Sequence, residues 1–109
     1  MVARSRQRAK QALSFFLAER YVSSANLELA RLDAARASAA SSEPAEGGTA
    51  VRYVGSTLIP SDETCFVFFE ARSAAEVRRL LERASLPYDR VVEAVRITVD
   101  DTNEGGREK

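Results

Sequence analysis

Five side chains of this sequence have the chemistry of catalytic or metal-binding groups and lie in or beside apolar runs. They are Glu19, Tyr21, Tyr53, Cys65 and Glu70. A carboxylate or a phenol can serve as a general acid or base, and a thiolate or a carboxylate can bind a metal ion. The chain has no histidine, which excludes Ser-His triads, imidazole bases and the commonest metal ligand. No catalytic constellation is complete, so the residues favour binding over catalysis.

The same side chains also have ordinary structural explanations. Arg20 or Arg52 can form a cross-strand ion pair with Glu70 or Glu93, and we favour this role for the acids. Cys65 is most simply explained as a small buried hydrophobe. Hydroxyl groups can line a pocket, although threonine and tyrosine are common in strands. If the chain has a ligand pocket, its candidate lining is Glu19, Tyr21, Tyr53, Ser56, Thr57, Cys65 and Glu70.

The composition indicates one ordinary globular domain. A chain of 109 residues can bury one core but not two, and 45% hydrophobic with 29% charged residues is typical of this class. The net charge is zero, which argues against a nucleic-acid binder that depends on a broad basic field. A protein or nucleic-acid partner recruited by the basic residues 4–10 is the least favoured interpretation.

The single cysteine and the lack of a long apolar run bear on location. One cysteine allows no intramolecular disulfide, which suits a reducing cytoplasm. The apolar run at residues 12–18 follows a basic start like the core of a signal peptide, but Glu19 and Arg20 stand where small residues should precede cleavage. No apolar run approaches the ~20 residues that span a bilayer. We expect a cytoplasmic protein without membrane contact.

The stretch 51–71 organises the rest of the chain. Two strand-like runs, at 51–59 and 64–70, are separated by the turn residues 60–63, which begin with a proline. The second run is apolar on both faces: cysteine, valine and phenylalanine alternate with Phe66 and Phe68. A strand with one face in water should alternate apolar and polar residues. This strand is therefore central in its sheet, and both of its faces are covered.

The remaining elements are predicted from periodicity and from capping residues. Residues 13–22 form a second doubly apolar strand, and residues 90–99 form the last strand. One helix begins at a serine cap, Ser23 or Ser24, and runs to residue 40 with a mainly alanine stripe that includes Leu29 and Leu32. The other helix begins at the capping box of residues 73–76 and buries Val77, Leu80, Leu81 and Ala84.

Three other segments carry no regular structure in this interpretation. Residues 1–11 form a disordered basic arm, residues 41–49 a flexible connection and residues 100–109 a disordered acidic tail. The domain between arm and tail, residues 12–99, has the order strand, helix, strand, strand, helix, strand. This order predicts an α+β ferredoxin-like βαββαβ fold, with a four-stranded antiparallel sheet and two helices on one face.

Two helices cover only one face of such a sheet. The other face presents phenylalanine and leucine side chains over an area larger than a soluble monomer usually exposes. We therefore predict a twofold homodimer, sheet against sheet, of the dimeric α/β-barrel type. A terminal segment that folds over the face is the competing explanation.

Several strings of the sequence resemble a known family. They are AERY at 18–21, VRYVGST at 51–57, PSDETCF at 60–66, FEA at 69–71, the helix start at Ser73 and LPYDRVVEAV at 86–95. The chain resembles a family of small actinobacterial domains of unknown function that includes a nickel-binding protein with a ferredoxin-like fold. The resemblance covers most of residues 15–99. It implies a ferredoxin-like fold and raises nickel as a possible ligand.

Nickel is disfavoured by the residues themselves. Nickel sites use imidazole, thiolate or carboxylate ligands in a defined geometry, and no histidine ligand can be carried over to this chain. Cys65 with Glu19 and Glu70 would make only an improvised metal site, so we expect no metal or other cofactor. The leading hypothesis is a non-enzymatic accessory protein, or one that binds a small ligand inside a dimer. The alternative is a cofactor-free enzyme of the monooxygenase or isomerase type, an analogy from fold alone.

Overall fold

The computed structural model describes residues 13–42 and 51–99. The strands are β1 (Ser14–Tyr21), β2 (Arg52–Ile59), β3 (Thr64–Ala71) and β4 (Arg90–Ala94), and the helices are α2 (Leu27–Ser42) and α3 (Ala74–Arg83). Two short 3-10 turns, η1 (Ser23–Ala25) and η3 (Pro60–Asp62), complete the elements. The predicted arm 1–11, the tail 100–109 and most of the connection 41–49 lie outside the described residues.

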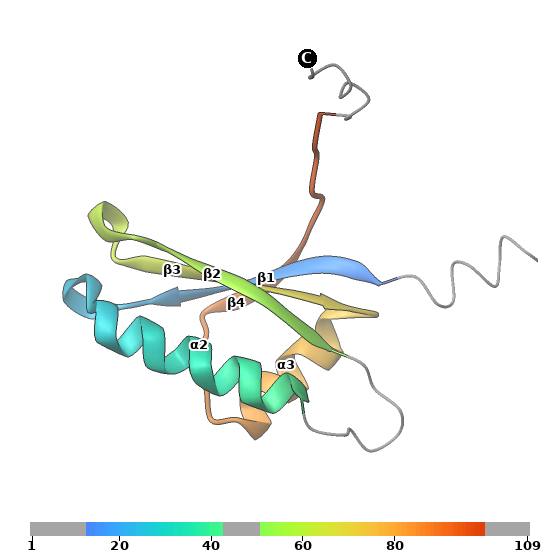
Figure 1. Cartoon of the computed structure of the whole chain (residues 1–109), viewed down its shortest axis with the longest axis horizontal. Helices are drawn as coiled ribbons and strands as arrows, with labels where there is room; N and C mark the ends of the chain where they lie inside the picture. Colours follow the sequence, from blue (N-terminus) through green and yellow to red (C-terminus); the bar gives the residue numbers. More distant parts are fainter. Residues whose placement is uncertain (1–12, 43–50, 100–109) are drawn as a thin grey trace, which may run out of the picture.

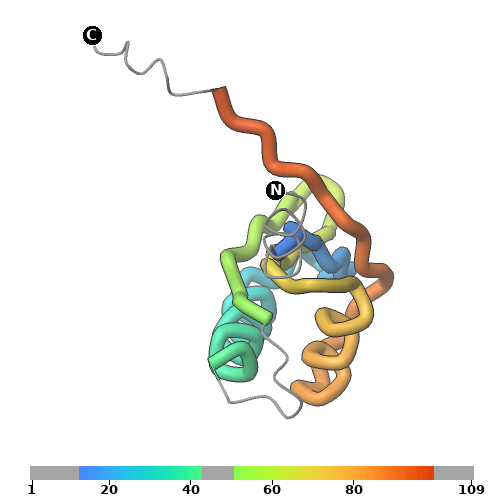
Figure 2. Tube along the Cα trace, turned by 90° about the vertical axis from the view of Figure 1, so that its right-hand side faces the viewer, coloured from blue at the N-terminus to red at the C-terminus, as the bar shows by residue number. Residues whose placement is uncertain are grey.

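The four strands form one antiparallel sheet in the order β2-β3-β1-β4. Both helices lie on the same face of this sheet, as the two views at right angles show (Figures 1 and 2). The predicted α+β ferredoxin-like fold is confirmed. The two doubly apolar strands, β1 and β3, are the inner pair, in agreement with the prediction from their composition.

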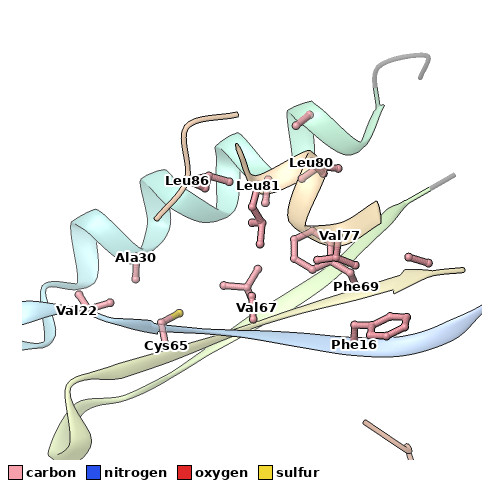
Figure 3. Close-up of a cluster of buried hydrophobic side chains, with 14 residues drawn as sticks. Phe16, Val22, Ala30, Cys65, Val67, Phe69, Val77, Leu80, Leu81 and Leu86 are labelled. Atoms are coloured by element: carbon pink, nitrogen blue, oxygen red, sulfur yellow. The ribbon is translucent and has the colours of Figure 1, made fainter. Parts of the chain in front are cut away.

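The core lies between the sheet and the two helices (Figure 3). Alternate residues of β1 and β3 point into it, and α3 adds an apolar stripe of three residues. The largest fully buried side chains are Phe69, Leu80, Val22, Val77 and Cys65. No helix among the described residues has the length and the apolar composition needed to span a membrane.

The start of α3 follows the sequence prediction. The Ser73 hydroxyl accepts a hydrogen bond from the Glu76 N–H at 3.2 Å. The Glu76 carboxylate accepts a bond from the N–H of Arg72 at 3.3 Å, one residue earlier than the capping-box pattern places it. Both contacts satisfy N–H groups at the start of the helix or just before it, and the predicted buried residues of α3 face the core.

Helix α2 differs from the prediction in its start and in its buried face. Asn26 caps the helix, because its side-chain oxygen accepts from the Leu29 N–H at 3.1 Å, whereas Ser24 has a positive φ of 59° inside η1. The buried residues are Ala30, Asp33, Ala37 and Ala40, and Leu32 is half exposed. The predicted stripe was therefore wrong. Its register was set by two leucines, whereas a buried aspartate marks the true face.

The last strand is shorter than predicted. Strand β4 ends at Ala94, which pairs with Phe15 near the start of β1, so residues 95–99 are not part of the sheet. Val95, Ile97 and Val99 are 78%, 86% and 90% exposed. Both views show this segment leaving the sheet on the side opposite the helices (Figures 1 and 2). The predicted strand was therefore wrong for residues 95–99, where no neighbouring strand among the described residues pairs with the chain.

Candidate functional site

The face of the sheet opposite the helices carries an aromatic surface that no helix or strand of residues 13–42 and 51–99 covers. Cross-strand partners share a face, so the register assigns the side chains of this face. We give the name aromatic face to five apolar residues at its centre, which are Phe15, Leu17, Phe66, Phe68 and Val92. All five are half-buried.

Aromatic stacking orders the centre of this face. The rings of Phe15 and Phe68 stack with centroids 5.4 Å apart and planes 7° from parallel. The guanidinium carbon of Arg96 lies 4.3 Å from the centroid of Phe15. A cation this close to an aromatic ring is attracted by the ring's quadrupole. The segment after β4 thus contacts the aromatic face through Arg96.

The two central strands carry similar five-residue strings, each of which begins with phenylalanine, ends with glutamate and is apolar in between. Residues 15–19 read FFLAE and residues 66–70 read FVFFE. Leu17 and Phe68 are directly paired, and this pair is the centre of a local twofold relation between the strands. The relation superimposes Phe15 on Phe66 and Glu19 on Glu70. The twofold relation holds for these inner-strand positions, whereas Val92 on β4 has Gly55 on β2 as its counterpart.

The symmetry extends to two ion pairs at diagonally opposite corners of the face. Arg90 on β4 contacts Glu19 on β1 at 2.8 Å, and Arg52 on β2 contacts Glu70 on β3 at 2.7 Å. Arg52 donates two hydrogen bonds to Glu70, from Nε and from Nη2. The Arg52–Glu70 pair is one of the cross-strand pairings predicted from the sequence. At the other corner, the hydrogen bond to Glu19 raises the pKa of Arg90. Every charged side chain that β1–β4 place on this face is paired.

The helix side of the sheet holds a third ion pair and a very small cavity. Arg20 on β1 contacts Asp33 on α2 at 2.5 Å, with both side chains largely buried. Beside the pair lies a cavity of about 10 Å³, which also contacts Leu81, Leu86 and Pro87. A space of this size holds at most one water molecule. The cavity is too small for an organic ligand.

Cys65 is the cross-strand partner of Arg20 and is only 2% exposed. Burial raises the pKa of the Cys65 thiol; the Asp33 carboxylate raises it further and the Arg20 guanidinium lowers it. A thiol in this state is a weak nucleophile and a weak ligand. The burial of Cys65 agrees with its predicted role as a small hydrophobic core residue.

The seven candidate pocket residues do not gather at one cavity of the described chain. Tyr53, Ser56 and Cys65 face the helices, where the Tyr53 hydroxyl shares a 2.7 Å hydrogen bond with Ser56. The other four face away from the helices, and are Glu19, Tyr21, Thr57 and Glu70. Glu19 and Glu70 lie at opposite ends of the inner strand pair, because Glu70 pairs with Phe15.

One end of β1 is joined to three loops by two acids, Glu63 and Asp89, that are not among the seven candidate pocket residues. Glu63, in the hairpin turn, accepts from the Tyr21 hydroxyl at 3.2 Å and from the Ser24 N–H at 2.8 Å. Asp89, before β4, accepts from the Tyr21 N–H at 2.8 Å, and its own N–H donates to the Glu19 carbonyl. Glu63 has a positive φ of 51°. Each of these acids fixes a loop to the same strand end.

These loops contain the strings that carried the family resemblance. The AERY string forms the end of β1, PSDETCF spans the turn with Glu63, and LPYDRVVEAV includes Asp89. A family model for the nickel responsive protein SCO4226-like family matches residues 16–94. The chain belongs to this family. No curated protein and no solved structure matches the chain significantly.

The SCO4226-like family description concerns nickel, so we tested the donor set of this chain. Within residues 13–42 and 51–99, no three cysteine, aspartate or glutamate side chains come together as a metal site. The sequence has no histidine, and the single thiol is buried with a raised pKa. Glu19 and Glu70 are each engaged by an arginine. The residues described do not fit a nickel site.

Proposed function

We propose that the chain is a non-enzymatic binding protein that acts as a homodimer, in which two copies face each other through their aromatic faces and hold a small, partly apolar ligand between the sheets. The observation that carries this proposal is the uncovered aromatic face itself. Sheets stack about 10 Å apart, so a second copy would bury this face, and a ligand would occupy the space that the facing side chains leave between them. Membership of the SCO4226-like family supports a small binding or accessory protein.

Charge favours a second copy as the cover of this face. The charged side chains that the strands place there are neutralised within the subunit, as Glu19 with Arg90 and Glu70 with Arg52. Two identical faces with such internal pairs can approach without the repulsion that like charges would cause. The twofold pattern of the face also matches an isologous contact, in which the same patch serves both subunits.

The small size of the cavity on the helix side supports a ligand position between the sheets. On the helix side, the cavity beside Arg20 and Asp33 admits one water molecule. We therefore expect the ligand on the other side of the sheet, where aromatic rings supply the walls of a pocket. The Glu19–Arg90 and Glu70–Arg52 pairs stand at the corners of that face and offer polar contacts to a ligand.

The groups that an enzyme would use are engaged elsewhere in this arrangement. Glu19 and Glu70 are paired with arginines, and the hydroxyls of Tyr21 and Tyr53 bond to Glu63 and Ser56. No observation favours the monooxygenase or isomerase alternative over binding. We place the protein in the cytoplasm, where its one thiol stays reduced, and we do not assign nickel as its ligand.

The test measures the mass of the purified protein in solution and under native ionisation. We expect a sedimentation mass of twice the 12.0 kDa of one chain at micromolar concentration. Native mass spectrometry should show an additional small mass on the dimer that is lost on denaturation. A protein that sediments as a single subunit at ~100 µM, well above the Kd of a specific dimer, would overturn the dimer. A dimer that carries no extra mass and has a solid interior would overturn the ligand pocket alone.

A further inference from the structure

The segment at residues 95–99, which we call the C-terminal segment, has the pattern of a strand without a partner. Val95, Ile97 and Val99 alternate with Arg96 and Thr98, and β-branched residues of this kind favour strands. Its three apolar side chains are between 78% and 90% exposed, more than any of the other large hydrophobic side chains in the described residues. Isolated exposed hydrophobics are ordinary, but three in strict alternation on an extended segment are not.

The direction of the C-terminal segment identifies what it meets. Residues 95–99 leave the sheet from the edge strand β4 on the side opposite the helices (Figures 1 and 2). That is the side on which the second copy lies in the proposed dimer. Five extended residues reach about 16 Å, more than the ~10 Å between two stacked sheets. The segment is long enough to reach the other subunit.

An unpaired strand edge is available on that subunit. Strand β2 is an edge strand of eight residues, paired only with β3, and Val54 on it is 37% exposed. When two such sheets stack about a twofold axis parallel to their strands, the β4 edge of one lies over the β2 edge of the other. An exposed edge of this length is a template for another strand.

We propose that the C-terminal segment of each subunit crosses to the second copy and packs along its β2 edge, so that the two segments close the open sides of the two-sheet sandwich. This inference rests on the proposed homodimer and adds to it a reciprocal exchange. The segment supplies main-chain groups to the β2 edge and buries its valine and isoleucine side chains at the seam. Arg96, held over Phe15 of its own subunit, fixes the point at which the crossing begins.

The first test uses cysteine cross-linking between subunits in a Cys65→Ala background. Subunits with Ile97→Cys are mixed with subunits that carry Val54→Cys, and a short bis-maleimide is added. We expect a covalent heterodimer. The matched control places the second cysteine at Glu82, which is exposed on α3 on the other side of the sheet, and should give none. Equal cross-linking with Val54→Cys and Glu82→Cys would overturn the exchange.

The second test measures the dimer Kd by sedimentation. Replacing Val95, Ile97 and Val99 together by serine should weaken the dimer at least tenfold, because burial of even one such side chain is worth more than a factor of ten. Thr98→Ser, in the same segment, should leave the Kd unchanged. If the unaltered protein is itself a monomer, the homodimer fails and the exchange with it. If it is a dimer whose Kd the triple variant does not change, only the exchange fails.

Discussion

Phe15 and Phe68 stack nearly parallel across the two inner strands, 5.4 Å between ring centres, on the face of the sheet that no helix covers. The neighbouring residue on β3, Phe69, points the other way and is completely buried against the helices. One strand therefore carries adjacent phenylalanines in opposite environments. Phe68 belongs to the aromatic face and Phe69 to the core. Substitutions at these two positions should therefore affect dimerisation and folding separately.

Substitution of these two phenylalanines should give opposite results. Phe68→Asp places a charge on the aromatic face, so the variant should fold but remain monomeric, because the desolvated charge has no partner in the interface. Phe69→Ala removes a core ring and should cost about 3–5 kcal/mol of unfolding free energy. Circular dichroism, urea unfolding and sedimentation separate the two outcomes. A Phe68→Asp variant that still dimerises would contradict the face-to-face contact.

The fold was predictable from sequence because β1 and β3 are apolar on both sides. Such strands have to be central, and the order of elements then leaves the ferredoxin-like arrangement. The register of α2 was not predictable, since Asp33 looks like a surface residue until its contact with Arg20 is known. The end of β4 was not predictable either. Nothing in the alternation at residues 95–99 says whether a neighbouring strand exists.

The candidate site was predicted only in part. The Arg52–Glu70 pair follows from residue types on neighbouring strands and forms as expected. The contacts of Glu63 and Asp89 with Tyr21 join residues 42 and 68 positions apart, and no local pattern reports a contact of that range. Their presence in the strings of the family resemblance was the available signal. It marked the residues without indicating that they meet at one strand end.

The buried pair of Arg20 and Asp33 gives a second prediction, about stability. Asp33→Ala leaves the guanidinium largely buried without its partner and should cost about 3 kcal/mol in urea unfolding. Replacing both residues, as Arg20→Met with Asp33→Leu, removes the desolvated charges together and should restore most of that loss. If the double variant is less stable than Asp33→Ala, the pair contributes more than the charges alone explain.

The two corner ion pairs should behave alike in salt. Arg52–Glu70 and Arg90–Glu19 have similar exposure, with the arginine about two-thirds exposed in each. Their coupling, measured by double-mutant cycles in a monomeric Phe68→Asp background, should be small, equal and lost in 1 M salt, where the Debye length is about 3 Å. Retention of coupling by one pair alone would show that the two halves of the face are not equivalent.

Cys65 predicts how stability depends on pH in the alkaline range. Its pKa is raised in the folded state, mainly by burial, so the folded protein keeps the thiol protonated where the unfolded chain ionises. The stability that depends on the neutral thiol is complete below the unfolded pKa of about 8.5 and is lost as pH rises from there toward the folded value. The free energy of unfolding of the unaltered protein, minus that of Cys65→Ala, should therefore fall as the pH rises above about 8.5. A thiol reagent should also label the native protein slowly and the unfolded chain rapidly. A difference between the two proteins that stays flat with pH, together with fast labelling of the native state, would show that the thiol is open to water.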